Sequence, residues 1–514
     1  MDDSPLPLIL EQARRFGSRE LDAAAIDEAA DIPAEVIAMA ARQGLFGLTV
    51  PEEHGGLGMG LGEACAVVAE LARWDRSVAT TVGLHLGLGT RALVELSAPA
   101  LRERWLPRIA EGEVVAAFCA TEPAAGSDLT RVQTTARVEG DELVIDGEKS
   151  FVTNGGFAGI FTVLARTPGL GGTRATSLLC VPRDTAGISY GPEEHKLGIR
   201  GSSTVTVRFD GARIPMDHVL GEPGKGLDAA HRSLEWGRTI MSAGCIGTAR
   251  AALDATLLQV QARKQFGRAL VKLGGVQEQV ARMASLLFAM EATVEHVGDV
   301  EREGGELGLP ASVAKVLCSE GAFEICDRAI QLHGGLGFIE ETGVALLARD
   351  CRVTRIFEGT NDVLLIHLGT ALVATSEGLP GARIHGEVEA WLSDASEVWA
   401  EAAERFSTTA TQLRKEHGIS IVRRPLMLTR LARAHVCLSA ASAAISRAAR
   451  MGRSQALRAE RATRSLVRES LVHLDSLGAA AEDAERDRVL VEQLTGADEA
   501  SDAPPRRASQ EVTP

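Results

Sequence analysis

The chain has few aromatic residues and no paired cysteine motif. Aromatic side chains make up 4% of the 514 residues, and a single tyrosine is present. The eight cysteines are scattered, and no two of them are spaced as Cys-x-x-Cys. This pattern predicts free thiols in a reducing compartment rather than a disulfide framework or a zinc site.

Long hydrophobic runs and an excess of positive charge are also missing. No apolar run approaches the about 18 residues that a membrane-spanning helix needs. The formal net charge of -15 argues against nucleic acid as the main partner. The N-terminal segment 1–17 is acidic and is interrupted by prolines, so we expect neither a signal peptide nor an Arg-rich transit peptide. These absences predict a cytoplasmic globular protein.

The hydrophobic pattern changes period along the chain and predicts a mostly α, α+β fold. Residues 1–114 are helical in period, and 115–222 hold short β-rich runs with Asp-Gly and Pro-Gly turns, which indicates a middle antiparallel β domain. Long helical runs over 223–372 predict a four-helix bundle, and 383–495 predict an additional helical domain. We expect the polar tail 496–514 to be disordered.

One carboxylate lies in an apolar segment. The stretch from Thr354 to Gly369 reads TRIFEGTNDVLLIHLG, and Glu358 stands between an aromatic residue and a Gly-Thr pair. Taken alone, this acid is more simply a solvated side chain or a charge near a helix N-terminus. The bulk composition does not decide between these interpretations and a chemical role.

Two segments of the β region have residues that suit ligand binding. AAFCATEPAAGSD (116–128) is a strand-like run that enters a loop rich in Thr, Gly and Ser. Such a loop offers N–H and hydroxyl groups to an oxygen-rich ligand, although an ordinary turn with a Ser-Asp cap fits it as well. KSFVTNGG (149–156) places an aromatic residue before a threonine and a tight turn.

Together with RIFEGTND, these segments resemble the acyl-CoA dehydrogenases over residues from about 30 to 370. Further matching segments are GLTVPEEHGG (47–56), HKLGIRGSSTVTVRFDGARIP (195–215), ARKQFG (262–267), QLHGGLGF (331–338) and RDCRVTRIFEGTND (349–362). The family fold is helices, a β-barrel-like middle domain and a four-helix bundle. The resemblance implies an FAD enzyme that oxidises acyl-CoA and passes its electrons to an electron-transfer flavoprotein.

The resemblance also assigns roles to individual residues. Those implied to bind FAD are Phe118, Ala120, Thr121, Gly126, Ser127, Phe151, Thr153, Arg263, Phe266, Gln331, Gly334, Gly335, Thr360 and Asp362. Those implied to meet the substrate are Ser127, Arg238, Phe357 and Gly359. The family usually has Trp where this chain has Phe151, so we expect a flavin site that is retuned by the loss of the indole N–H.

Glu358 matches the catalytic base of the family. A solvated carboxylate is too weak a base for the α-hydrogen of a thioester, so we expect burial among Ile356, Phe357 and Leu364 to raise the pKa of Glu358. In the family, the N–H of the base and the flavin ribityl chain polarise the thioester carbonyl. The α-proton then moves to the base while a hydride passes to flavin N5, which gives the trans-2-enoyl-CoA.

Some relatives place their base near Glu235 instead. Because Glu358 is present, we interpret Glu235 as structural or substrate-facing. His85 and His333 lie in apolar, glycine-rich surroundings, and we expect both to be hydrogen-bonded packing residues. No group of His, Cys and Asp has the spacing of a metal site.

The chain continues for about 140 residues beyond the bundle, as it does in the very-long-chain branch of the family, whose members are homodimers. Residues 411–470 hold thirteen Arg and Lys against three Asp and Glu. These basic helices could lie on an anionic bilayer, at the inner membrane face, or pair with acids of the core. The sequence leaves both alternatives open.

These observations predict a dehydrogenase of long-chain or very-long-chain acyl-CoA that contains FAD and forms a homodimer. Two alternatives stay open. One is an acyl-CoA oxidase, which passes electrons to oxygen, and the other is a flavin-binding relative that acts as an assembly or scaffold factor. The intact Glu358 argues against the scaffold alternative.

Overall fold

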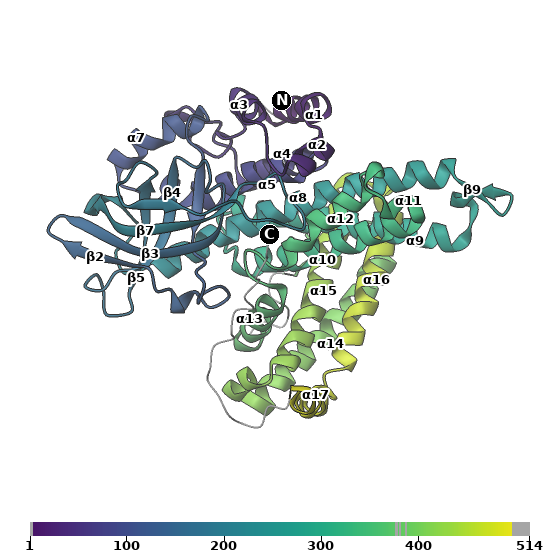
Figure 1. The fold of residues 1–514 in the computed structure, drawn as a ribbon. Helices are drawn as coiled ribbons and strands as arrows, with labels where there is room; N and C mark the ends of the chain where they lie inside the picture. The colour runs from purple at the N-terminus through teal and green to yellow at the C-terminus, as the bar shows by residue number, and fades with distance from the viewer. Residues whose placement is uncertain (1–3, 376–378, 380–381, 386–387, 496–514) are drawn as a thin grey trace.

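The computed structural model describes residues 4–375, 379, 382–385 and 388–495. Helices, a β sheet, a helical bundle and a second set of helices follow one another along the chain (Figure 1). This order confirms the predicted fold class. The tail that we expect to be disordered lies outside the described residues.

The first region is a set of helices and short helical turns. They are α1 (Leu6–Glu20), α2 (Ala23–Ala29), α3 (Ala34–Arg42), η1 (Glu52–His54), α4 (Leu61–Ala72), α5 (Arg76–Leu84), η2 (His85–Gly89), α6 (Arg91–Leu96) and α7 (Pro99–Ala110). Asp75 caps α5 by accepting the N–H of Val78 at 2.6 Å. The next element, η2, is a single π-helical turn, and such turns are frequent at functional sites.

The middle region is an eight-stranded sheet. Its elements are β1 (Ala116–Cys119), η3 (Leu129–Arg131), β2 (Thr135–Glu139), β3 (Glu142–Thr153), β4 (Ile160–Arg166), β5 (Thr176–Pro182), β6 (Ile188–Tyr190), β7 (Thr204–Pro215), η4 (Met216–His218) and β8 (Val219–Leu220). The strand order is β6-β7-β3-β2-β4-β5-β8, and β1 pairs with β4. Because β1 and β2 run parallel to β4, the predicted antiparallel domain is in fact mixed at this point.

Both faces of the central strands are covered. Ile160 and Leu164 of β4 share a core cluster with α7 and α8 on one face. Phe161 and Val163 share another with β3 and β7 on the opposite face. Residues on both faces of β4 and β5 are therefore buried, which explains why these strands are almost continuously apolar.

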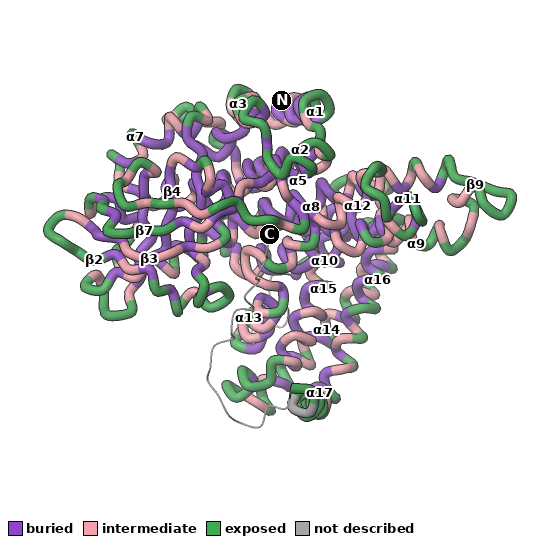
Figure 2. Tube along the Cα trace, in the orientation of Figure 1, coloured by how far each residue is buried: buried purple, intermediate pink, exposed green. Residues whose placement is uncertain are grey.

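The bundle follows the sheet. Its elements are α8 (Gly226–Ala262), β9 (Lys264–Gln265), β10 (Arg268–Ala269), η5 (Leu270–Lys272), α9 (Gly274–Arg302), α10 (Gly308–His333), α11 (Gly335–Phe338), η6 (Glu340–Thr342), α12 (Val344–Arg352), η7 (Val353–Arg355) and α13 (Asn361–Ala374). The 37-residue α8 packs against α4, α5, α9 and α10. Figure 2 shows buried residues along the middle of α8 and exposed residues in the hairpin of β9 and β10. This hairpin ends a projecting arm, which consists of the end of α8, the hairpin and the start of α9.

The additional helices pack against the bundle. They are η8 (Ala390–Leu392), α14 (Ser393–His417), η9 (Gly418–Arg423), α15 (Pro425–Met451), η10 (Arg453–Gln455), α16 (Ala456–Asp475) and α17 (Ala480–Thr495). Pro425 begins α15 at a position where its missing N–H costs no hydrogen bond. In the described part of the chain, no helix is long and apolar enough to cross a lipid bilayer.

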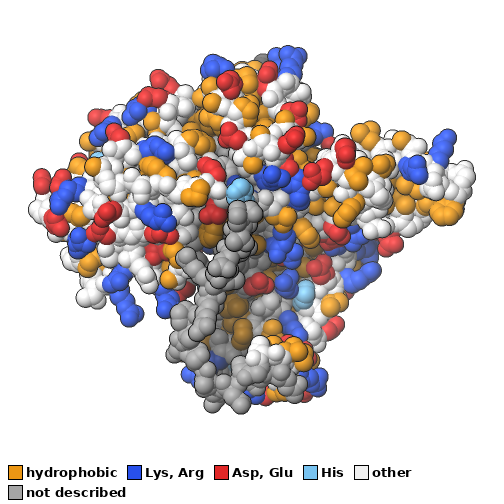
Figure 3. Space-filling view, viewed as in Figure 1, with side chains coloured by type: hydrophobic (Ala, Val, Ile, Leu, Met, Phe, Trp, Pro, Cys, Tyr) orange, Lys and Arg blue, Asp and Glu red, His pale blue; other side chains and the backbone are white. Residues whose placement is uncertain are grey.

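Some of the basic residues in this region pair with acids of the bundle. Arg447 of α15 lies 2.5 Å from Glu291 and 3.0 Å from Glu295, both on α9. Arg450 lies 3.6 Å from Glu295 and 3.8 Å from Asp299. Core pairing therefore accounts for these two arginines. Positive and negative side chains are interspersed over the face seen in Figure 3.

We expect Arg447→Met to lower the free energy of unfolding by about 2 kcal/mol, because the mostly buried Glu291 loses one of its two cations and the exposed Glu295 loses its nearer one. Thermal unfolding followed by circular dichroism measures the change. Arg486→Met is the control, since the ion pair of Arg486 with Glu482 is exposed and such pairs contribute about 0–1 kcal/mol. Equal losses in the two variants would contradict this role of Arg447.

Candidate active site

Glu358 lies in a left-handed turn between η7 and α13. The φ angle is 56° at Glu358 and 96° at Gly359. A left-handed backbone is unfavourable for a residue with a Cβ atom, so contacts must hold this turn. Nε of Arg238 donates to the backbone oxygen of Glu358 at 3.0 Å, and Nζ of Lys315 donates to that of Gly359 at 2.7 Å. One half-buried cation and one buried cation therefore hold two successive carbonyl groups.

One oxygen of the Glu358 carboxylate is enclosed. Its Oε2 atom is buried and has no hydrogen-bond partner among the described residues. A Cβ atom at Gly237 of α8 would lie 3.0 Å from this oxygen and 2.6 Å from Leu88 of η2, so the glycine leaves the space that the carboxylate needs. Burial raises the pKa of Glu358 to about 7, against the opposing charge of three neighbouring cations. The group is thus suited to accept a proton near neutral pH.

The residues around the carboxylate differ in part from those expected. Leu364 is buried and Phe357 is half-buried against the bundle core, but Ile356 is 50% exposed. The expectation that Ile356 helps to bury Glu358 is therefore wrong. The carboxylate lies instead against Gly237 of α8, next to the left-handed turn.

Arg238, which we expect to meet the substrate, also supports the turn. Its Nε atom donates to the backbone oxygen of Glu358. Gly359 lies against the same guanidinium, since a Cβ atom there would be 3.6 Å from Nη2 of Arg238. This arginine therefore supports the turn, whatever else its remaining N–H groups contact.

A buried ion pair holds the loop that follows β1. Lys149 of β3 is fully buried, and its Nζ atom lies 2.7 Å from Glu122 and 3.1 Å from the backbone oxygen of Ala120. The N–H of Ser150 donates to the backbone oxygen of Thr121 at 2.9 Å. The loop is thereby tied to the strand that carries the second predicted flavin segment.

The structure brings these two predicted flavin segments together. Phe118 and Ala120 are buried at the end of β1, whereas Gly126 and Ser127 are exposed. Thr121 is half-buried between them. No atom lies within 4 Å of a Cβ atom placed at Gly126, so the loop is open on this side.

A β-bulge places Phe151 at the surface. The register of β3 against β7 shifts between Lys149 and Val152. Phe151 has a φ angle of 56° and is 66% exposed, whereas Thr153 is buried. An exposed aromatic ring on a strained backbone is a surface that a flat ligand would cover.

Five other predicted flavin residues lie elsewhere, after the end of α8 and at the end of α10. Arg263 and Phe266 belong to the exposed turn of the projecting arm, and Phe266 is 88% exposed with a φ angle of 53°. Gln331, Gly334 and Gly335 are exposed at the junction of α10 and α11. Figure 1 shows the β9 hairpin far from the sheet, so one chain does not bring Arg263 and Phe266 to the sheet that carries the first two flavin segments.

The N-terminus of α13 lies next to the turn of Glu358. Thr360 caps this helix by accepting the N–H of Val363 at 3.4 Å, and Asp362 is exposed in its first turn. Within the described ranges, the N–H groups of Glu358, Gly359 and Thr360 have no acceptor. Free N–H groups at a helix N-terminus suit an anionic or carbonyl oxygen. Together with the open loop and Phe151, they fit a flavin nucleotide.

The predicted packing histidines are confirmed. His85 is fully buried, and its Nδ1 atom accepts the N–H of Ala116 at 2.9 Å, so its Nε2 atom donates to the backbone oxygen of Phe46 at 3.0 Å. Burial lowers the pKa of His85 to about 4. Nδ1 of His333 lies 2.7 Å from the backbone oxygen of Ala329.

The structure also places the eight cysteines and Glu235. All eight cysteines are buried and free. Glu235 is half-buried on α8, where burial raises its pKa, and a Cβ atom at Gly308 would lie 3.2 Å from it. No group of three His, Cys, Asp or Glu side chains in the described part could hold a metal ion.

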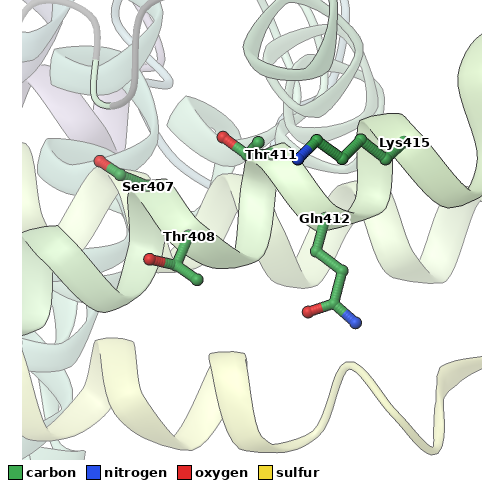
Figure 4. A pocket seen from close by; sticks show the side chains of 5 residues that line it. All are labelled: Ser407, Thr408, Thr411, Gln412 and Lys415. Atoms are coloured by element: carbon green, nitrogen blue, oxygen red, sulfur yellow. The ribbon is translucent and has the colours of Figure 1, made fainter.

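A surface hollow on α14 lies away from Glu358. Its volume is about 440 Å³. Figure 4 shows the side chains that line it, which all come from this one helix: Ser407, Thr408, Thr411, Gln412 and Lys415. It contains no acid and no enclosed polar atom, so it lacks the features that make the turn of Glu358 a candidate active site.

Sequence reasoning missed several residues that shape the site. Gly237 makes room for the carboxylate, and Lys315 and Asn361 hold the turn from α10 and α13. Arg76 is buried on α5 and lowers the pKa of Glu358. A usable signal existed for Lys315, because it is the one charged residue in the apolar run ASVAKVLC (311–318).

Comparisons with known proteins show the family of this chain. Models of acyl-CoA dehydrogenase domains match residues 7–113 (N-terminal domain), 117–212 (middle domain) and 224–373 (C-terminal domain). The chain is 35% identical over 449 residues to the very long-chain specific acyl-CoA dehydrogenase, mitochondrial, of Homo sapiens, which covers 79% of this chain and 68% of that protein. The chain belongs to the acyl-CoA dehydrogenase family.

Solved structures of the family show how far the likeness extends. An acyl-CoA dehydrogenase complexed with FAD from Bacillus anthracis is 25% identical, with a TM-score of 0.85 over 98% of this chain and 93% of that one. Butyryl-CoA dehydrogenase from Megasphaera elsdenii is 32% identical, with a TM-score of 0.70 over 73% of this chain and 99% of that one. The first of these acyl-CoA dehydrogenases therefore shares the helices that follow the bundle. The predicted family and enzyme class are confirmed.

We expect Glu358→Gln to stabilise this acyl-CoA dehydrogenase at alkaline pH. Because the folded-state pKa of Glu358 is raised to about 7, the wild type loses stability as the pH rises from the unfolded-state pKa of about 4.5 through 7. The loss is about 3 kcal/mol, and the glutamine variant does not suffer it. Melting temperatures of both proteins at pH 5 and pH 8 measure the effect. A difference in melting temperature that is the same at both pH values would contradict it.

Proposed function

We propose that the protein is an FAD-dependent dehydrogenase that converts long-chain or very-long-chain acyl-CoA to the trans-2-enoyl-CoA. The observation that carries this proposal is the enclosed carboxylate of Glu358, whose Oε2 atom has no partner among the described residues. The family supplies the reaction type. The identity to a very long-chain specific relative and the helices beyond the bundle support the chain length.

Glu358 has two tasks in this proposal. Its carboxylate takes the α-proton, for which a pKa of about 7 is well matched to neutral pH. Its N–H group, free within the described residues, donates to the thioester carbonyl and stabilises the charge that develops there. Bound FAD would supply the acceptor for the hydride that leaves the β-carbon. Gly237 provides the space in which the carboxylate stays free of competing hydrogen bonds.

The cofactor would be held by the loop after β1, by Phe151 and Thr153 on β3, and by the N-terminus of α13. The arm and the junction of α10 and α11 carry the other predicted flavin residues at a distance from this site. A second copy of the chain would bring them to it, which supports a homodimer. We propose an electron-transfer flavoprotein as the acceptor, in keeping with the family.

Turnover with a series of acyl-CoA substrates from C4 to C20 tests the function. We expect an optimum at C12 or longer and a loss of about 10³-fold in kcat for Glu358→Gln, because the variant has no base at the α-carbon. Glu235→Gln is the matched control on the neighbouring helix, and we expect it to lose less than about tenfold.

The outcomes of this series separate the alternatives. An optimum below C8 would contradict the chain-length assignment. Hydrogen peroxide release in place of reduction of an electron-transfer flavoprotein would identify an oxidase. A protein that binds FAD but turns over no acyl-CoA would point to the scaffold alternative.

We also propose that the exposed arginines after α15 contact anionic lipid. Arg453 and Arg458 are exposed, and no acid lies within 4 Å of either in the described part of the chain. We expect the protein to co-sediment with vesicles that contain anionic lipid at low salt and to be released at high salt, since salt screens the attraction. Replacing both arginines by Gln should weaken binding. An absence of binding at low salt would remove the proposal.

A further inference from the structure

A lysine contacts the turn of Glu358 but forms no ion pair with a carboxylate of the described residues. Lys315 of α10 is fully buried, and its Nζ atom lies 2.7 Å from the backbone oxygen of Gly359 and 2.6 Å from Oδ1 of Asn361. Asn361 donates in turn to Ser319 at 3.0 Å and to Glu320 at 2.8 Å. No carboxylate in the described residues lies within 4 Å of Lys315.

Burial of Lys315 without a contacting acid is unfavourable in free energy, whereas another buried lysine of the chain has such an acid. Lys149 is equally buried, but it has Glu122 at 2.7 Å. Burial lowers the pKa of Lys315 to about 8, and among the neighbouring charges Glu358 opposes this most strongly. A buried ammonium without a contacting anion is strongly unfavourable. The hydrogen bonds of Lys315 all go to the residues that follow Glu358, which points to a role in holding that segment.

We propose that Lys315 is a positioning residue for the catalytic base. Its hydrogen bond to Gly359 keeps Glu358 in the left-handed conformation, and its positive charge favours the ionised carboxylate. The inference rests on the proposed function, in which Glu358 takes the α-proton. It assigns to Lys315 no contact with substrate or cofactor.

Lys315 is the neighbour whose charge can change near neutral pH. The charged and titratable groups that face the pair are Arg76 from α5, Glu235, Arg238 and Cys245 from α8, Glu320 from α10 and Arg355 from η7. Arginine stays protonated over the accessible range of pH. Burial raises the pKa of Cys245 to about 11, so this thiol stays neutral. Glu320 is paired with Arg355 at 2.7 Å.

Lys315→Met tests the proposal through the pH dependence of kcat/KM. Loss of the positive charge makes the ionised carboxylate less stable, so we expect the acid limb of the profile to move up by about one pH unit. Below the limb, kcat/KM then falls about tenfold. The same shift should appear in an infrared titration of the protein without substrate, in the protonated-carboxyl band that is missing in Glu358→Gln.

A second variant and a control accompany this one. Asn361→Asp keeps the lysine but places a negative charge beside it, so the limb and the infrared band should move in the same direction. If Lys315→Met does not fold, Asn361→Asp provides the test of the proposal in its place. Arg447→Met removes a cation that pairs with Glu291 and Glu295 of α9 and is not among the charges that act on Glu358, so it should lower the melting temperature without moving the limb.

The proposal is overturned if the limb and the infrared band of Lys315→Met keep their wild-type positions, even where kcat falls. It is also overturned if Arg447→Met moves them as far as Lys315→Met does, because general destabilisation would then explain the shift. A wild type that turns over no acyl-CoA would defeat the proposed function instead. The infrared titration would still show whether Lys315 controls the ionisation of Glu358.

Discussion

The turn at Glu358 and Gly359 is the constraint on which the site depends. A left-handed conformation costs ~1–2 kcal/mol for a residue with a side chain, and burial of the carboxylate adds to that cost. Hydrogen bonds to charged donors contribute about 1.5–3 kcal/mol each, so the bonds from Arg238 and Lys315 are large enough to hold the turn. The two cations bind only the carbonyl groups of the turn, so they leave the N–H of Glu358 and its Oε2 atom available.

The scaffold supports this turn through small residues on α8. Gly237 leaves space for the carboxylate, and Gly244 leaves space for Arg76, whose Nη1 atom would lie 1.6 Å from a Cβ atom there. These glycines are seven residues apart, so they lie on the same face of the helix two turns from each other. One face of α8 thus admits both the acid and a cation that lowers its pKa. The abundance of small residues in the sequence has a specific use here.

The sequence predicts the order of the elements well because each change of hydrophobic period is a local property. Glu358 is also predictable, since its motif is contiguous. The exposure of Ile356 is not, because the direction of the turn depends on backbone angles that the motif does not state. The apolar run around Lys315 marks this residue, but its role is not predictable, because its partners Gly359 and Asn361 are distant in the chain and meet it only after folding. The parallel pairing of β1 with β4 likewise joins strands that are distant in the chain.

The exposed end of the arm supports the proposed homodimer on physical grounds. Phe266 is 88% exposed on a left-handed backbone, and Phe338 at the end of α11 is 84% exposed. A strained conformation that turns an aromatic ring into water has no benefit within one chain. Burial of such a ring would contribute about 1.5–3 kcal/mol, which exceeds the cost of the strain. The arm therefore suits the contact that the proposed homodimer would supply, while the base and the turn that holds it need only one chain.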